Sequence, residues 1–175
     1  AQIAAEVLDV SIETVIVVHP DTDVTPYDMS TLGSRSTYHM GHAVRLAATE
    51  ARDKLAEMAD DLGLPEGSNV PVKEMFIRKF GMQAGNVVGT GSFKPPYQPT
   101  NHETGLSPNA TPYWMIGATG VEISVDTETG HVTIDRMINV ADLGTALNPE
   151  IVATQLSGAA VMQLGFTMTE DMIYD

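Results

Sequence analysis

The chain has 175 residues, 43% of them hydrophobic, and a formal net charge of -14 from 23 acidic and 9 basic residues. This length suits the core of one soluble domain, and the acidic balance argues against nucleic acid and membranes as partners, because nucleic acid and anionic lipid bind through positive charge. The sequence has no cysteine, which excludes a disulfide, a thiolate metal site and a thiol nucleophile.

The N-terminal part is expected to fold as a helix, a strand, a long loop and a long helix. Residues 3–8 carry apolar side chains at helical spacing, and residues 14–18 form a β-branched run that indicates a strand. Residues 19–35 are rich in Pro, Asp, Thr and Gly, which predicts an ordered loop of the kind that carries binding sites. From about residue 36 to 62 the apolar residues keep a helical period, and Gly63 ends this longest helix.

The middle of the chain predicts a second helix followed by irregular structure. Asn69 and Pro71 mark a helix start, a buried stripe follows up to Phe80, and Gly81 ends the helix. Residues 86–93 are expected to form a short strand. Residues 94–112 contain five prolines and no periodic pattern, which predicts a loop.

The C-terminal part predicts a β-hairpin and a last helix. Between residues 113 and 140, two alternating runs flank the turn of residues 126–130, whose glycine can take a positive φ. Pro149 stands at the first turn of the last helix, where its missing N–H is tolerated. Gly165 is expected to end or bend this helix. The chain opens without the basic start and long apolar stretch of a signal peptide, and both of its ends are expected to be cuts.

The stretch Gly33-Ser34-Arg35-Ser36-Thr37 places a glycine, three hydroxyls and an arginine at the start of the longest helix. Free N–H groups, the positive end of the helix dipole and the hydroxyls can all donate to phosphate, and Arg35 adds charge. The alternative is an ordinary helix cap with a solvated arginine, since Ser and Thr are common caps. The local sequence leaves both interpretations open.

Three further pairs are candidates for a role. Asp21 and Asp23 could be paired acids or magnesium ligands, His39 and His42 could bind a metal, and His102 and Glu103 could line a substrate channel. The aspartate pair lies in a Pro-rich loop, where a turn that caps its own backbone is more typical than magnesium binding. The histidine pair shares one helix face but lacks a third ligand, which favours surface or interface histidines. The third pair lies in the 94–112 loop, and the sequence assigns it no role.

Short motifs follow one another in a fixed order along nearly the whole chain: Gln2-Ile3-Ala4-Ala5-Glu6, Asp21-Thr22-Asp23 with Pro26, Gly33-Ser34-Arg35-Ser36-Thr37 with Gly41 and Ala43-Val44, Gly120-Val121-Glu122, Asp142-Leu143-Gly144, Leu147-Asn148-Pro149, and Gln155 with Gly158 and Leu164-Gly165. Each motif alone is weak. The ordered set resembles the second molybdopterin-binding region of the molybdenum hydroxylases, the family of xanthine dehydrogenase and aldehyde oxidase, and the resemblance is weakest between Leu62 and Pro112.

The resemblance implies which residues hold the cofactor. Gly33, Ser34 and Ser36, with Arg35 beside them, would contact the phosphate or dinucleotide end of the pterin. Gln155 matches a glutamine that hydrogen-bonds the pterin, a role that its amide can fill because it offers both donor and acceptor. From the residues alone, Gln155 could equally be an ordinary polar helix residue.

The resemblance also implies an α+β fold in which long helices pack on one face of a mixed sheet, with residues 1–175 forming part of a molybdopterin-binding domain. The implied enzyme oxidises an aldehyde or N-heterocycle with water as the oxygen source. Its cofactor is molybdenum-molybdopterin, expected in the cytosine dinucleotide form, and its electrons pass to iron–sulfur clusters and FAD. The resemblance implies a glutamate base downstream of this region, and no match for it occurs before Asp175, so we name no catalytic residue. We also name no metal ligand.

The implied partners are the remainder of the molybdenum subunit, an iron–sulfur subunit, an FAD subunit and a small-molecule substrate, in the cytoplasm. Two alternatives stay open: a carbon monoxide dehydrogenase-type large subunit, and a non-catalytic binding or assembly module with the same fold. An unrelated nucleotide-binding enzyme is disfavoured, because the sequence lacks a phosphate-loop or dinucleotide glycine pattern.

Overall fold

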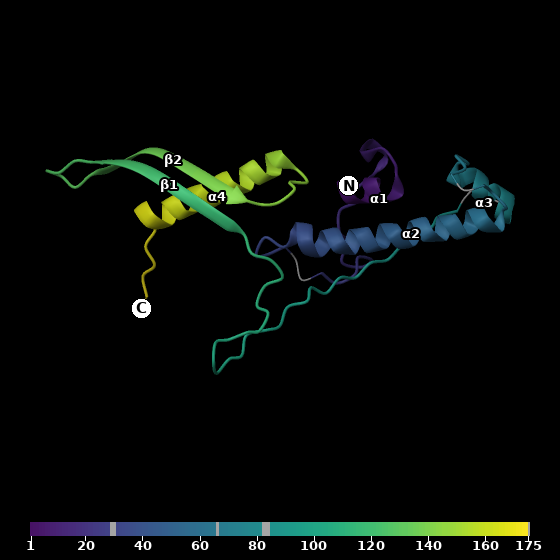
Figure 1. Cartoon of the computed structure of the whole chain (residues 1–175), viewed down its shortest axis with the longest axis horizontal. Helices are drawn as coiled ribbons and strands as arrows, with labels where there is room; N and C mark the ends of the chain where they lie inside the picture. Colours follow the sequence, from purple (N-terminus) through teal and green to yellow (C-terminus); the bar gives the residue numbers. More distant parts are fainter. Residues whose placement is uncertain (29–30, 66, 82–84, 175) are drawn as a thin grey trace. The chain divides into compact units, whose positions relative to one another are not determined.

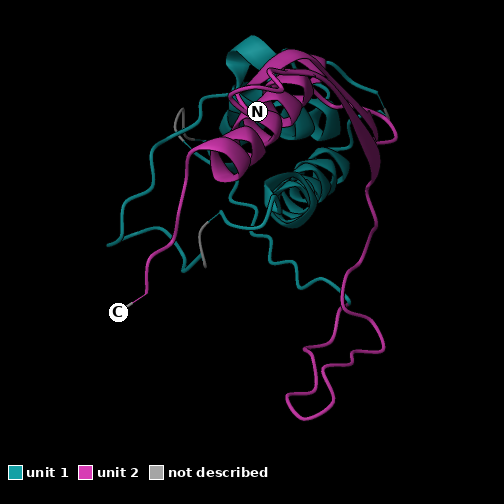
Figure 2. Cartoon of the chain, turned by 90° about the vertical axis from the view of Figure 1, so that its left-hand side faces the viewer, with its two compact units in different colours: residues 1–96 teal, residues 97–175 magenta. Residues whose placement is uncertain are grey.

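The computed structural model describes residues 1–28, 31–65, 67–81 and 85–174. The chain divides into two compact units, residues 1–96 and 97–175, which Figure 2 colours separately. The boundary falls inside the proline-rich loop predicted at 94–112, and that loop contains no helix or strand. The loop predicted at 19–35 is also irregular in its described part, residues 19–28 and 31–35.

The first unit is helical. Its α-helices are α1 (Gln2–Leu8), α2 (Gly41–Asp61) and α3 (Val72–Phe80) (Figure 1). It also contains the 3-10 turn η1 (Ile12–Thr14) and the π-helical turn η2 (Ser36–Met40). Small residues let α1 approach α2: Ala5 and Ala48 are buried, and a Cβ added at Gly41 would lie 3.0 Å from Ile3. The helices predicted at residues 3–8, 36–62 and 71–80 are therefore confirmed, and the second of them opens with a wider turn.

A small apolar cluster joins the end of α2 to α3. Met58, Met75 and Phe76 are buried, and partly buried apolar side chains pack around them, including Leu62 and Val87. Gly81 ends α3 with a φ of 67°, a conformation that glycine adopts without a steric penalty. This cluster fixes the distal end of α2, at the opposite end of the helix from η2.

The second unit contains the predicted hairpin. Strand β1 (Ile116–Val125) pairs antiparallel with β2 (Val132–Asp142), with Ile116 opposite Asp142 and an irregularity between Glu122 and Ile123. In the turn, Gly130 has a φ of 75° and its N–H donates to the Asp126 carbonyl (2.7 Å). Hydrogen bonds from Thr129 and the Glu128 N–H lower the pKa of the Asp126 carboxyl below its ordinary value of 3.8.

Helix α4 (Pro149–Met168) lies alongside the hairpin in the same unit (Figure 1). The Asn148 side chain caps it by accepting from the Ile151 N–H (3.1 Å). Gly165 does not end the helix, because its regular hydrogen bonding continues to Met168. By length and composition α4 is the one helix in the described part of the chain that could cross a membrane, but the interior helix of a soluble protein meets the same criterion.

The α+β class is confirmed, whereas two predicted strands are wrong. Residues 15–18 are extended but pair with no described strand, and the Ile16, Val17 and Val18 side chains are exposed. Residues 86–93 are also extended without a strand partner. A β-branched run indicates an extended backbone, but a strand needs the hydrogen-bonding groups of a second chain segment. In the described residues the sheet is two-stranded and antiparallel, where the resemblance implied a mixed sheet.

Candidate cofactor site

The predicted phosphate site is an exposed loop that leads into the longest helix. Gly33 and Ser34 have positive φ angles of 63° and 57°, and Arg35 returns to the right-handed helical region. A non-glycine residue with positive φ is uncommon and often marks a functional turn. Turns of this kind gather successive backbone N–H groups on one side, where they can bind an anion.

The turn after this loop argues against a simple helix cap. Residues 36–40 form one π-helical turn before α2 begins, and neither η2 nor α2 has a side-chain hydrogen bond at its N-cap. Extra-wide turns inside helices occur frequently at functional sites. The sequence predicted one regular helix from residue 36, because apolar spacing does not separate a π turn from the α-helix that follows it.

The side chains of the loop are tied to each other. Arg35 lies 3.9 Å from the Asp28 carboxylate, and its side chain is 16% exposed while that of Asp28 is 50% exposed. The Ser36 hydroxyl donates to the Thr31 hydroxyl (3.1 Å) and stays at the surface. The arginine charge is therefore shared with Asp28, and the serine hydroxyl remains within reach of a ligand.

An extended segment, residues 85–93, follows α2 toward this loop, and we call it the strap. Two of its glycines touch the helix backbone: a Cβ added at Gly89 would lie 2.0 Å from the Ala47 carbonyl oxygen, and one added at Gly91 would lie 2.0 Å from that of Ala43. Any side chain at these two positions would push the strap off the helix. The glycine spacing is the signal from which sequence reasoning could have found this close approach.

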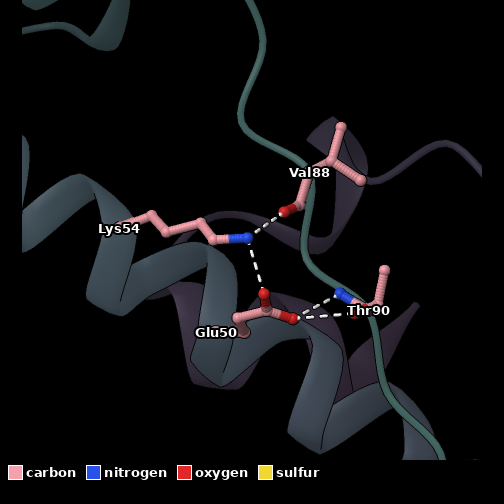
Figure 3. A network of polar contacts seen from close by, with 4 residues as sticks. All are labelled: Glu50, Lys54, Val88 and Thr90. Carbon is pink, nitrogen blue, oxygen red and sulfur yellow. Dashed lines mark hydrogen bonds and ion pairs between the residues drawn. The ribbon is translucent and has the colours of Figure 1, made fainter.

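Polar contacts hold the middle of the strap (Figure 3). The Thr90 N–H and hydroxyl both donate to Glu50 Oε2 (2.7 and 3.0 Å), and Lys54 donates to Glu50 Oε1 (2.6 Å) and to the Val88 carbonyl (2.9 Å). The Lys54 hydrogen bond, followed by those from Thr90, lowers the pKa of the Glu50 carboxyl from 4.5 to about 2. Sequence reasoning missed both charged residues, which look like an ordinary i, i+4 pair on a helix surface.

Aromatic rings hold the far end of the strap. The Phe93 ring stacks on His42 with centroids 4.4 Å apart and meets Tyr38 edge-on at 5.4 Å. His42 Nδ1 lies 2.6 Å from the Tyr38 carbonyl oxygen. An open groove of about 420 Å³ runs beside the strap, lined by Pro26 and residues 89–92.

Residues of the other candidate pairs make contacts that stabilise turns or pack aromatic rings. Asp21 accepts from the Asp23 N–H (2.9 Å) within a turn, as predicted for a loop that caps its own backbone. His42 packs on an aromatic ring, and the described residues contain no group of three or more His, Asp or Glu that could hold a metal. In the 94–112 loop, the backbone N–H of Glu103 donates to the Asn101 side chain (2.8 Å).

Gln155 lies in the second unit, on α4, whereas Gly33, Ser34, Arg35 and Ser36 lie in the first. The Gln155 side chain is exposed and makes no hydrogen bond to any other residue that the structure describes. The predicted site is thus divided between the two units, and Gln155 presents its amide at the surface of its own unit.

Comparison with known proteins decides the family. A sequence model described as molybdopterin cofactor-binding domain matches residues 1–175. The chain belongs to this family. It is 31% identical to the xanthine dehydrogenase molybdenum-binding subunit of Escherichia coli O157:H7, over 100% of the chain and 24% of that protein. It is 31% identical to subunit gamma of the 6-hydroxypseudooxynicotine dehydrogenase complex of Paenarthrobacter nicotinovorans (100% of the chain, 23% of that protein), and 28% identical to the carbon monoxide dehydrogenase large chain of Afipia carboxidovorans (100% and 22%).

Membership in the molybdenum hydroxylases, inferred above from the ordered motifs, is therefore confirmed. The chain spans about a quarter of the length of these three relatives. The loop at residues 33–36 fits an anionic end of the molybdopterin cofactor: it is exposed, it carries hydroxyl donors, and a Cβ at Gly33 would meet nothing within 4 Å. Space and donors are therefore both present for a phosphate group.

Proposed function

We propose that this chain holds the phosphate or dinucleotide end of molybdopterin in a molybdenum hydroxylase that oxidises an aldehyde or N-heterocycle with water as the oxygen source. The observation that carries the proposal is the positive-φ turn at Gly33 and Ser34 in front of an uncapped helical turn, in a chain of the molybdopterin-binding family. We further propose the cytosine dinucleotide form of the cofactor, with iron–sulfur and FAD groups on partner subunits, in the cytoplasm.

When bound, the molybdenum cofactor supplies the oxidation chemistry. The chain's own residues bind and orient it. The N–H groups near Gly33 and the hydroxyls of Ser34 and Ser36 can donate to phosphate oxygens. Arg35 adds positive charge, which Asp28 partly offsets and holds in place. Gln155 can donate to and accept from the edge of the pterin heterocycle.

A second candidate is the carbon monoxide dehydrogenase type of activity. Its support is the 28% identity to the carbon monoxide dehydrogenase large chain over the whole of this chain. Both activities require the same cofactor contacts, so the residues named above would keep their roles. Assays of the purified complex with carbon monoxide, aldehydes and N-heterocycles would separate the two candidates.

The first test of the proposed function is the cofactor content of the purified native complex. We expect molybdenum and a cytosine nucleotide, released by mild hydrolysis, in equal amounts. Elemental analysis and chromatography of the released nucleotide measure both. A complex with neither molybdenum nor nucleotide would support the non-catalytic module instead.

The second test is the double variant Ser34→Ala with Ser36→Ala. It removes two charge-assisted hydrogen bonds worth about 1.5–3 kcal/mol each, so cofactor occupancy should fall while the protein stays folded. Ser34→Gly is the matched control for backbone strain, because glycine suits the φ of 57° and also lacks the hydroxyl. Unfolding of the double variant with full cofactor retention in its folded fraction would favour the capping interpretation.

A further inference from the structure

The strap connects the apolar cluster at one end of α2 to the loop at residues 33–36, here called the cofactor loop, at the other end. Val87 packs on the cluster around Met58 near the end of α2. Phe93 stacks on His42, which comes sixteen residues before Met58 in the same helix. Six extended residues span about 20 Å, and sixteen helical residues span about 24 Å. The strap therefore covers most of the length of α2 in nearly straight form, with the Glu50 and Lys54 contacts midway.

Both ends of the cofactor loop lie next to the strap. Phe93 contacts Tyr38, which belongs to the same π turn as Ser36. Across the groove, Pro26 faces residues 89–92, and it stands two positions before Asp28, the partner of Arg35. A shift of the strap along or away from α2 would thus move contacts on either side of residues 33–36.

We propose that the strap is the positioning element of the cofactor loop and that Glu50, which acts through its contacts with the strap, is the positioning residue that sets it. This inference rests on the proposed function. Glycine packing at Gly89 and Gly91 permits the close approach but is not directional. The two hydrogen bonds from Thr90 to one Glu50 oxygen give the approach its register.

The closing experiment compares four variants of the native complex. Glu50→Gln removes the charge, and Thr90→Val removes the hydroxyl with little change in volume. Thr90→Ser keeps both Thr90 hydrogen bonds. Glu57→Gln is the matched control, because Glu57 is an exposed glutamate on the same helix whose side chain makes no hydrogen bond or ion pair with the described residues. Each variant is measured twice, for hydrogen exchange of peptides covering residues 31–40 and 86–93, and for molybdenum and nucleotide content.

We expect Glu50→Gln and Thr90→Val to speed hydrogen exchange in both segments and to lower cofactor content by roughly tenfold. Losses of about this size follow when a residue that supports the ligands of a bound metal, without binding the metal itself, is replaced. Thr90→Ser and Glu57→Gln should match the wild type. Faster exchange confined to residues 86–93, with unchanged cofactor content, would show that the strap is merely structural and would overturn the inference.

The same measurements distinguish a failure of the proposed function from a failure of this inference. If the wild-type complex holds no molybdenum, the cofactor assignment is wrong, but exchange in residues 31–40 still reports whether the strap holds this loop. Coupled loosening of both segments would keep the positioning role, and independent exchange would remove it.

Discussion

At the residue scale, the most informative side chains are those that the sequence presents as ordinary. Glu50 and Lys54 form an i, i+4 ion pair of a kind that contributes little on an exposed helix. Here the same two residues also bind the backbone of a segment that is distant in sequence, Lys54 at a separation of 34 residues and Glu50 at a separation of 40 residues. The charged groups of Glu50 and Lys54 therefore hold residues 88–90 against α2, in addition to pairing with each other along the helix.

The first prediction concerns the ionisation of Glu50. Its pKa is lowered from 4.5 to about 2, so its contacts stabilise the fold fully above pH 4.5 and are lost as pH falls from 4.5 toward 2. At about pH 3.5, where ordinary glutamates are mostly protonated, Glu50 should remain ionised. Carbon-13 NMR of the side-chain carboxyls, with Glu50→Gln for assignment, measures this.

Lys54→Met provides the control for this titration. Because the Lys54 hydrogen bond is the largest cause of the lowered pKa, its removal should move the Glu50 midpoint up toward 4.5. A wild-type midpoint already near 4.5 would contradict the network shown in Figure 3.

At the element scale, the hairpin and α4 follow local sequence rules closely. The alternating runs, the turn glycine and the Asn-Pro start each appear where the pattern placed them, because they depend on contacts within a few residues. The irregular segments do not follow such rules. Residues 15–18 and 86–93 have strand-like composition, and the segment at 86–93 packs on a helix instead.

The second prediction is that Gly130→Ala destabilises the hairpin by about 1 kcal/mol or more, because the φ of 75° is unfavourable for a residue with a Cβ. Thermal unfolding followed by circular dichroism measures the change. Thr127→Ala, in the same turn, should leave the midpoint of unfolding near that of the wild type. Equal midpoints for Gly130→Ala and the wild type would mean that the turn relaxes freely.

The third prediction is that Asn148→Ala destabilises the start of α4 by about 1 kcal/mol, because the Ile151 N–H loses its acceptor. Hydrogen exchange of the first turn of α4 should become faster. Asn148→Asp keeps an acceptor oxygen and should behave like the wild type. If the alanine and aspartate variants exchange alike, the cap contributes nothing.

At the scale of the whole molecule, much apolar surface remains uncovered. The accessible area is 14426 Å², whereas two compact domains of half this mass would expose about 10,000 Å² together. Helix α4 has no buried residue, and Val161, Met162 and Phe166 are all more than 60% exposed. The chain spans about a quarter of the length of the three relatives named above.

The fourth prediction is that residues 1–175 expressed alone fold only in part, hold the cofactor weakly and turn over neither aldehyde nor heterocycle. The uncovered apolar area limits stability, and a chain without cysteine cannot hold thiolate-ligated clusters for electrons to leave through. The measurement is cofactor loading followed by an assay with an artificial electron acceptor. Sustained turnover would place a base within this chain, with His102, Glu103 and Glu122 the first to test.

The sequence by itself determined the α+β class, the helices, the hairpin, the family and the candidate loop at residues 33–36. These depend on periodicity, on turn residues and on ordered motifs, all of which are local along the chain. The division of the candidate site, with Gln155 in a different unit, was not visible in that pattern.

Only the tertiary structure decided how the irregular segments are used. A run of β-branched or glycine-rich residues specifies an extended backbone but not the surface on which it lies, since that surface is formed by residues distant in sequence. The strap lies on α2 because the backbone at Ala43 and Ala47 leaves room for glycine alone and because Glu50 meets the backbone of Thr90. The glycine spacing of the strap indicates that it can approach another backbone closely, but no window of neighbouring residues shows which surface it approaches.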